Sequence, residues 1–184
     1  MFAKCSCHPE MSTPAAAGSR REFMTRVALG AGAAMFMSFV PQVARAAGGT
    51  DALLLSCMDY RLVDDIVKYM DGRGMNGKYD HVVLAGASLG ATTDKQKAWG
   101  ETFWAHLGVA IDLHHIKNVI VMDHRDCGAY KVFLGEEVVK EPKIELATHT
   151  KHLNLIRSQI KAKHTTLEVE LLIMALDGKV ETVA

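Results

Sequence analysis

The residues best suited to chemistry stand in two short clusters, C-M-D-Y-R at residues 57–61 and H-R-D-C-G at residues 124–128. Each cluster directly follows an apolar run of the kind that forms a buried strand. Parallel α/β sheets bind ligands at the carboxyl ends of their strands, so we expect three side chains to meet there: Cys57, His124 and Cys127. Two thiolates and one imidazole form a three-ligand zinc set with an open fourth position, which is the composition of a catalytic rather than a structural site.

Two further side chains of the first cluster, Asp59 and Arg61, are the predicted catalytic residues. Alternate residues that leave a strand point to the same side, so both should lie on the side of Cys57. A carboxylate near the metal can accept a hydrogen bond from bound hydroxide, while Arg61 pairs with it and keeps it ionised. The alternative is that Asp59 itself completes the metal sphere, which would give a closed, non-catalytic zinc site.

The elements that position these clusters follow from the hydrophobic pattern. Strands are predicted over residues 52–56, 81–85, 118–122, 167–176 and 180–183. Helices are predicted over residues 62–70, 95–113, 128–134 and 144–163. This order predicts a single α/β domain with a mostly parallel central sheet flanked by helices. An apolar stripe on the second helix is typical of a core face or a dimer face: Trp99, Phe103, Trp104 and Leu107.

The composition limits the class of partner. The 21 lysines and arginines are balanced by 21 aspartates and glutamates, so the formal net charge is zero. Because these charges are spread along the chain, the basic stripe of a nucleic-acid-binding protein is missing. The composition therefore gives no indication of a nucleic-acid partner.

The first quarter of the chain has the pattern of an export signal. Paired arginines, Arg20 and Arg21, precede a weakly apolar stretch at residues 27–40 and an A-R-A sequence that ends at Ala46, a pattern that resembles twin-arginine signals. The apolar stretch of about 14 residues is shorter than the roughly 20 needed to cross a bilayer, which disfavours a retained membrane helix. We therefore expect residues 1–46 to be removed and residues 47–184 to form a periplasmic domain with no stable membrane span.

After this cleavage only Cys57 and Cys127 remain. Two cysteines in an exported protein would ordinarily indicate one disulfide. The twin-arginine route exports folded proteins, however, and zinc bound in the cytoplasm would keep both sulfurs as thiolates. Both alternatives stay open at this point.

The pattern C-x-D-x-R followed by H-x-x-C-G resembles the β-class carbonic anhydrases over roughly residues 53–130, with A-G-A-S at residues 85–88 in the place of that family's A-G-N loop. The resemblance implies zinc bound by the two cysteines and the histidine, and a catalytic dyad of Asp59 and Arg61. A zinc-bound hydroxide would then attack carbon dioxide to give bicarbonate. The resemblance also implies a homodimer or a dimer of dimers, and a substrate site formed by Gly86, Ala87, Ser88 and Gly128.

Three positions depart from that family pattern: Leu84 replaces an arginine, Ser88 an asparagine and Asp123 a glycine. Leu84 makes the approach to the metal less polar, which favours a related hydrolase acting on carbonyl sulfide or carbon disulfide as the alternative. Asp123 adds a negative charge beside the metal histidine. His81 is a candidate proton relay, although a structural role is the simpler interpretation.

A rival enzyme class is also present in the sequence. Residues 86–90 fit G-x-S-x-G, the nucleophile elbow of α/β-hydrolases, with Ser88 as the nucleophile. That fold needs more strands than this chain supplies and a late histidine on a loop. The histidines available here lie in or at the end of a helical stretch: His149, His152 and His164.

Overall fold

The computed structural model describes residues 50–184, so the export signal predicted for residues 1–46 lies outside the described residues. A central sheet has the strand order β2-β1-β3-β4-β5. The first four strands are parallel, and β5 pairs antiparallel with β4. The strands are β1 (Ala52–Ser56), β2 (Tyr79–Val83), β3 (Asn118–His124), β4 (Glu168–Met174) and β5 (Val180–Thr182).

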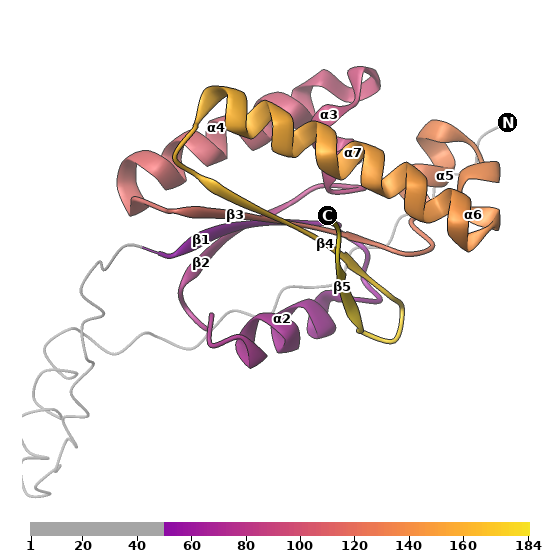
Figure 1. Cartoon of the computed structure of the whole chain (residues 1–184), viewed down its shortest axis with the longest axis horizontal. Coiled ribbons are helices and arrows are strands. Elements are labelled where there is room, and N and C mark those ends of the chain that lie inside the picture. Colours follow the sequence, from indigo (N-terminus) through magenta and orange to yellow (C-terminus); the bar gives the residue numbers. More distant parts are fainter. Residues whose placement is uncertain (1–49) are drawn as a thin grey trace, which may run out of the picture. The chain divides into compact units, whose positions relative to one another are not determined.

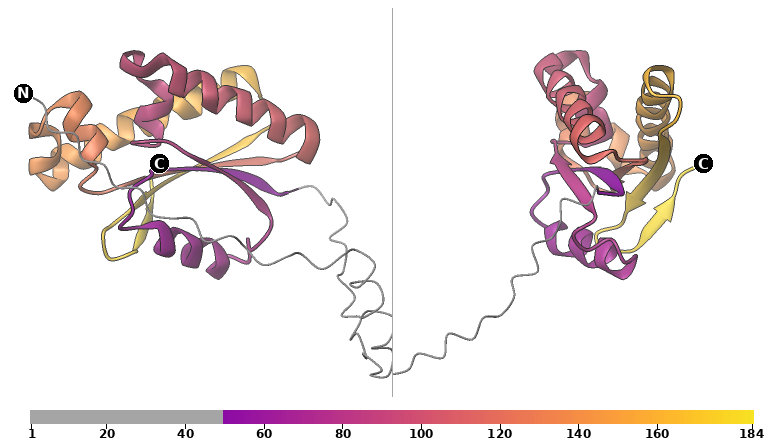
Figure 2. Two further views of the ribbon diagram at one scale, coloured as in Figure 1. Left: turned by 180° about the vertical axis from the view of Figure 1, so that it is seen from behind. Right: turned by 90° about the vertical axis from the view of Figure 1, so that its left-hand side faces the viewer.

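Helices cover both faces of this sheet (Figure 1). Helix α2 (Val63–Gly72) lies on one face, whereas α3 (Ser88–Thr92), α4 (Lys97–His114) and α7 (Pro142–Lys163) lie on the other. The right-hand view of Figure 2 shows the same arrangement, with α2 on one side of the sheet and α4 and α7 on the other. Three short elements complete the chain: η1 (Asp94–Gln96), α5 (Gly128–Leu134) and α6 (Glu137–Lys140). Among residues 50–184, no helix is both long and apolar enough to span a bilayer.

Two apolar clusters hold the layers together. On β1, Leu53 and Leu55 pack toward α4 and α7, whereas Ala52 and Leu54 pack toward α2. All five residues of β1 are buried, as expected for a central strand with helices on both faces. Each buried leucine stabilises the fold by about 1.5–3 kcal/mol before entropy is counted. The predicted single α/β domain is therefore confirmed.

The boundaries of two strands differ from the prediction in ways that matter for the site. The strand predicted over 81–85 lies at 79–83, because its parallel register aligns Tyr79 with Ala52 and the chain turns at Gly86 and Ala87, both at positive φ. The strand predicted over 118–122 continues to His124, because β4 offers two more partners. The short helices α3 and α6 were not expected, since four or five residues are too few to show a helical period.

Candidate metal centre

The fold brings together the three predicted ligands. Cys57 directly follows β1, His124 is the last residue of β3, and Cys127 precedes the first residue of α5. Because β1 and β3 are parallel neighbours, their carboxyl ends meet at one edge of the sheet. The ligand atoms of all three buried side chains lie within 4.8 Å of one another.

The spacing of the sulfurs fits a shared metal ion better than a disulfide. Cys57 Sγ and Cys127 Sγ are 3.9 Å apart, and both thiols are free. A disulfide would need about 2.05 Å between the sulfurs. Two thiolates on one tetrahedral zinc, each about 2.3 Å from the ion, stand about 3.8 Å apart. The structure therefore has the thiol arrangement of the metal alternative.

His124 presents its free ring nitrogen to this centre. Its Nδ1–H donates to the Arg125 carbonyl oxygen at 2.8 Å, which fixes the ring and leaves Nε2 with the lone pair. Nε2 is buried and has no hydrogen-bond partner within residues 50–184. A buried nitrogen without a partner costs free energy, and coordination to a metal would satisfy it.

The surroundings of Cys57 favour its thiolate form. Hydrogen bonding from Cys127 lowers the pKa of Cys57 to about 4, although burial opposes this shift. His124 and the Gly86 N–H also lower this pKa, and the Gly86 N–H donates to Cys57 Sγ at 3.3 Å. The same pairing, together with burial, raises the pKa of Cys127. Burial lowers the pKa of His124, but the Cys57 sulfur, the Arg125 carbonyl and the Asp59 carboxylate together raise it overall. The three donors thus share protons that a divalent cation would displace.

Asp59 and Arg61 form a fork-to-fork pair beside these donors. Arg61 donates from Nε to Asp59 Oδ1 at 3.0 Å and from Nη2 to Oδ2 at 2.8 Å, and its backbone N–H adds a third bond at 3.0 Å. This pairing lowers the pKa of Asp59 to about 2. Asp59 Oδ2 lies 3.8 Å from His124 Nε2. The carboxylate is therefore ionised, oriented and adjacent to the predicted metal position.

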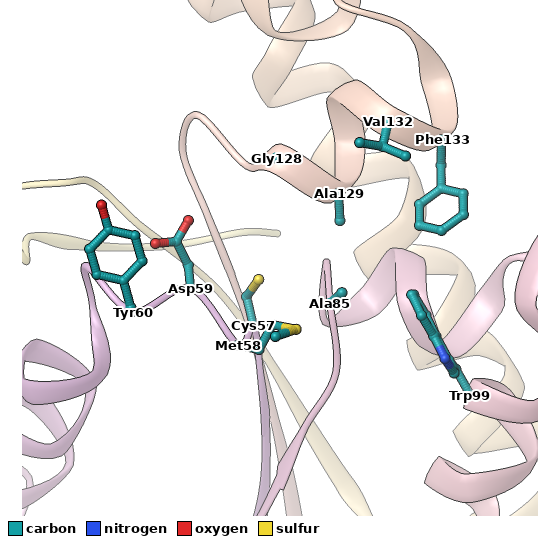
Figure 3. Close-up of a pocket in the computed structure, with 10 residues that line it drawn as sticks. All are labelled: Cys57, Met58, Asp59, Tyr60, Ala85, Trp99, Gly128, Ala129, Val132 and Phe133. Atoms are coloured by element: carbon teal, nitrogen blue, oxygen red, sulfur yellow. The ribbon is translucent and has the colours of Figure 1, made fainter. Parts of the chain in front are cut away.

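An apolar pocket of about 520 Å³ opens next to the donor atoms (Figure 3). Cys57 and Asp59 lie in its wall, and Trp99 and Phe133 meet edge-to-face at the other end with their ring centroids 5.6 Å apart. The rest of the lining comes from Met58, Tyr60, Ala85, Gly128, Ala129 and Val132. A small, weakly polar molecule could reach the centre through such a pocket.

The four predicted substrate-binding residues have different positions. Gly128 lines the pocket, whereas Gly86, Ala87 and Ser88 are not among its lining residues. The Ser88 side chain is fully buried, and its hydroxyl donates to Asp123 at 2.7 Å. A nucleophile elbow would instead expose that hydroxyl and pair it with a histidine, so this geometry disfavours the hydrolase alternative.

His81, the candidate relay, lies on the edge strand β2 and is not among the residues that line the pocket. Its Nε2 is 2.7 Å from the Ser56 hydroxyl. The residue as a whole is exposed, but desolvation of its ring lowers its pKa. The contact joins the neighbouring strands β2 and β1, which agrees with a structural role for His81.

Sequence reasoning missed a network around Asp123. This buried carboxylate does not face the metal ligands as a free charge, because it accepts hydrogen bonds from Ser88, Tyr130 and His149. The available signal was an acidic residue directly after an apolar strand, since a buried carboxylate must find donors. The identity of those donors was not visible, because two of them lie 26 and 35 residues away in the chain.

Comparison with known proteins agrees with this geometry. The family model described as "Putative carbonic anhydrase" matches residues 47–184. Two proteins described as uncharacterized, from Rickettsia conorii and Rickettsia bellii, are each 41% identical to this chain over 131 residues; the alignments cover 71% of this chain and 70% and 80% of those proteins. The structure of a carbonic anhydrase from Glaciozyma antarctica is 16% identical, with a TM-score of 0.51, and the match covers 90% of this chain and 96% of that one. At this identity the likeness establishes the fold.

Proposed function

Because this chain belongs to the carbonic anhydrase family that residues 47–184 match, we propose that it is a zinc enzyme that reversibly hydrates carbon dioxide to bicarbonate. One observation carries this proposal: the Cys57, His124 and Cys127 donors converge beside the Asp59–Arg61 pair at the wall of an apolar pocket.

Each residue has a distinct task in this proposal. Cys57, His124 and Cys127 would hold the zinc, which when bound lowers the pKa of a coordinated water and so supplies a nucleophile near neutral pH. Arg61 keeps Asp59 ionised and fixed in orientation. Asp59 can then accept a hydrogen bond from the reacting water and hold it for attack. The apolar wall formed by side chains such as Trp99 and Phe133 suits a linear substrate without charge.

The decisive test combines metal analysis with a stopped-flow assay of carbon dioxide hydration. We expect one zinc per chain, and we expect Asp59→Ala to keep the zinc while the rate falls about 10²- to 10⁴-fold, the usual contribution of a positioned proton-transfer group. Asp112→Ala, at an exposed site on α4, is the matched control and should retain full activity. A wild-type protein without zinc, or an Asp59→Ala variant of undiminished rate, would refute the proposal.

A related hydrolase acting on carbonyl sulfide or carbon disulfide is the second candidate. The apolar lining of the pocket favours it, because both sulfur-containing substrates are more hydrophobic than carbon dioxide. Leu84 is buried in the apolar core and is not among the pocket-lining residues, so the expectation that it makes the approach to the metal less polar was wrong. The comparison of turnover on the three substrates separates the two candidates.

A closed, non-catalytic zinc site is the third hypothesis, with Asp59 as the fourth ligand. The spectrum of the cobalt-substituted protein distinguishes the cases, because a bound water changes the spectrum as it titrates with pH whereas a bound carboxylate does not. The three bonds from Arg61 to Asp59 favour the open site.

We also propose that the protein works as a homodimer or a dimer of dimers. Apolar side chains at the pocket are widely exposed in the single chain: Met58 is 65% exposed, Tyr60 86% and Val132 80%. A second copy that covered them would bury this surface. Light scattering of the purified protein measures the assembly, and a monomeric mass at working concentration would contradict it.

A further inference from the structure

The side chain of Asp123 is 1% exposed. It lies at the end of β3, one residue before His124. It accepts four hydrogen bonds: from the Ser88 backbone N–H at 3.0 Å, the Ser88 hydroxyl at 2.7 Å, the Tyr130 hydroxyl at 2.7 Å and His149 Nδ1 at 2.8 Å. These donors come from α3, α5 and α7. Two of the four bonds go to a single residue, Ser88.

Ser88 follows a turn with unusual backbone geometry. Gly86 has φ +75° and Ala87 has φ +40° with ψ −99°. Glycine adopts a positive φ freely, but an alanine there is strained and keeps that conformation only when its surroundings enforce it. The Ser88 backbone N–H is the first amide after Ala87. Both this N–H and the Ser88 hydroxyl donate hydrogen bonds to the Asp123 carboxylate.

This turn acts directly on a metal ligand. The Gly86 N–H donates to Cys57 Sγ at 3.3 Å. The turn is also tightly enclosed, because a Cβ on Gly86 would lie 3.0 Å from the Ala129 Cβ on α5. A rotation that turned the Gly86 N–H away from Cys57 would remove the hydrogen bond from the sulfur.

We propose that Asp123 is a positioning residue of the metal centre: by holding Ser88 it keeps the strained Ala87 turn in place and so keeps the Gly86 N–H on the Cys57 sulfur. This inference rests on the proposed zinc site, but it does not depend on which substrate is hydrated. Hydrogen bonds to a ligand usually tune metal affinity by about 10- to 100-fold.

The test measures zinc affinity by competition with a chromophoric chelator, on the full folded domain and without any activity assay. Asp123→Asn should weaken zinc binding at least about tenfold, and Ser88→Ala should weaken it in the same direction. Adding Ala87→Gly to Asp123→Asn should restore much of the affinity, because glycine adopts the positive φ without the clamp. In cobalt-substituted Asp123→Asn, the sulfur-to-cobalt charge-transfer band should shift.

Tyr130→Phe is the matched control. It removes one hydroxyl donor from the same Asp123 oxygen at the same 2.7 Å, together with the 3.1 Å contact between the Tyr130 and Ser88 hydroxyls, but it leaves both bonds between Asp123 and Ser88 intact. It should lower thermal stability and change zinc affinity by less than about twofold, well below the tenfold effect of a lost ligand contact.

Three results would overturn the inference: wild-type zinc affinity in Ser88→Ala, equal weakening in Ser88→Ala and Tyr130→Phe, or no recovery on adding Ala87→Gly. If Asp123→Asn does not fold, the comparison of Ser88→Ala with Tyr130→Phe decides alone. A wild-type protein that binds no zinc would instead refute the proposed function, so the two failures are distinguishable.

Discussion

At the scale of single residues, Arg61 links two carboxylates from separate segments. Besides its bonds to Asp59, its Nη1 donates to Asp126 Oδ2 at 2.9 Å, so it ties the segment after β1 to the segment after β3. Asp126 also receives a bond from Lys131, which together with Arg61 lowers its pKa. The arginine thus orients the predicted catalytic carboxylate and joins the two segments that carry the predicted metal ligands.

The first prediction concerns acid sensitivity. The pKa of Asp59 is lowered from 3.8 to about 2 in the folded protein, so its pairing contributes stability that is present above about pH 4. That contribution is lost as the pH falls toward 2. In Arg61→Gln, the melting temperature should be a few degrees below that of the wild type at pH 5–7, and the difference should shrink below about pH 4.

Thermal melts recorded between pH 3 and pH 7 check this prediction. Arg157→Gln is the control, because Arg157 bonds the neutral side chain of Asn154 and its replacement should give a difference that does not vary with pH. A gap for Arg61→Gln that stays constant down to pH 3 would contradict the assigned pairing.

At the scale of elements, the site depends on the short turn between β2 and α3. In the turn, Gly86 at φ +75° points its amide at Cys57. In the first turn of α3, Gly90 passes so close to Ala85 that a Cβ would lie 2.5 Å from the carbonyl oxygen. Small residues are therefore required here by space. The A-G-A-S-L-G sequence is explained by packing as well as by chemistry.

The second prediction tests this turn. Gly86→Ala should destabilise the fold by about 1–3 kcal/mol, because alanine is strained at that φ and its Cβ would crowd Ala129 at 3.0 Å. Gly108→Ala on α4, where nothing lies within 4 Å of an added Cβ, is the control and should stabilise the helix by about 0.5–1 kcal/mol. Urea unfolding measures both, and equal effects would argue against a turn that requires glycine at this position.

At the scale of the whole molecule, the three predicted ligands follow β1, end β3 and precede α5, so metal binding would join segments that are 70 residues apart. A ligand that binds only the folded state stabilises it by mass action. Zinc should therefore support the entire domain as well as the site.

The third prediction is that chelation of zinc lowers the melting temperature by about 5–15 °C, which follows from a stabilisation of about 3–4 kcal/mol when zinc exceeds its dissociation constant 100- to 1,000-fold. Added zinc should restore the loss, whereas magnesium, which prefers oxygen ligands, should not. Cys127→Ser should melt at nearly the same temperature with and without zinc. Scanning calorimetry is the measurement, and a wild-type melting temperature that does not respond to zinc would refute the prediction.

The fourth prediction concerns export. We propose that residues 1–46 carry the protein to the periplasm through the twin-arginine route. Replacing Arg20 and Arg21 with lysine should leave the protein in the cytoplasmic fraction as an uncleaved precursor, detected by fractionation and mass spectrometry. A double replacement of Lys161 and Lys163 with arginine, within the mature domain, should leave export unchanged. Normal export of the first variant would disprove the signal.

The order of elements and the convergence of Cys57, His124 and Cys127 could be predicted from the amino-acid sequence. Strand β1 and helix α5 have the predicted bounds. Both could be predicted because an apolar run and a helical period are visible within the sequence of the segment itself. Cys57, His124 and Cys127 could be grouped because each stands at or just beyond the end of a strand, and parallel strands end at one edge of the sheet.

The surroundings of those ligands became visible only in the folded chain. Ser88 bonds the buried Asp123 and does not line the pocket, Trp99 contacts Phe133 at one end of the pocket, and Gly86 directs its amide to Cys57. Each of these contacts joins residues that are 29 to 35 positions apart. Such contacts depend on how helices pack over the sheet and on a strained turn, and neither is encoded in the periodicity of a short segment.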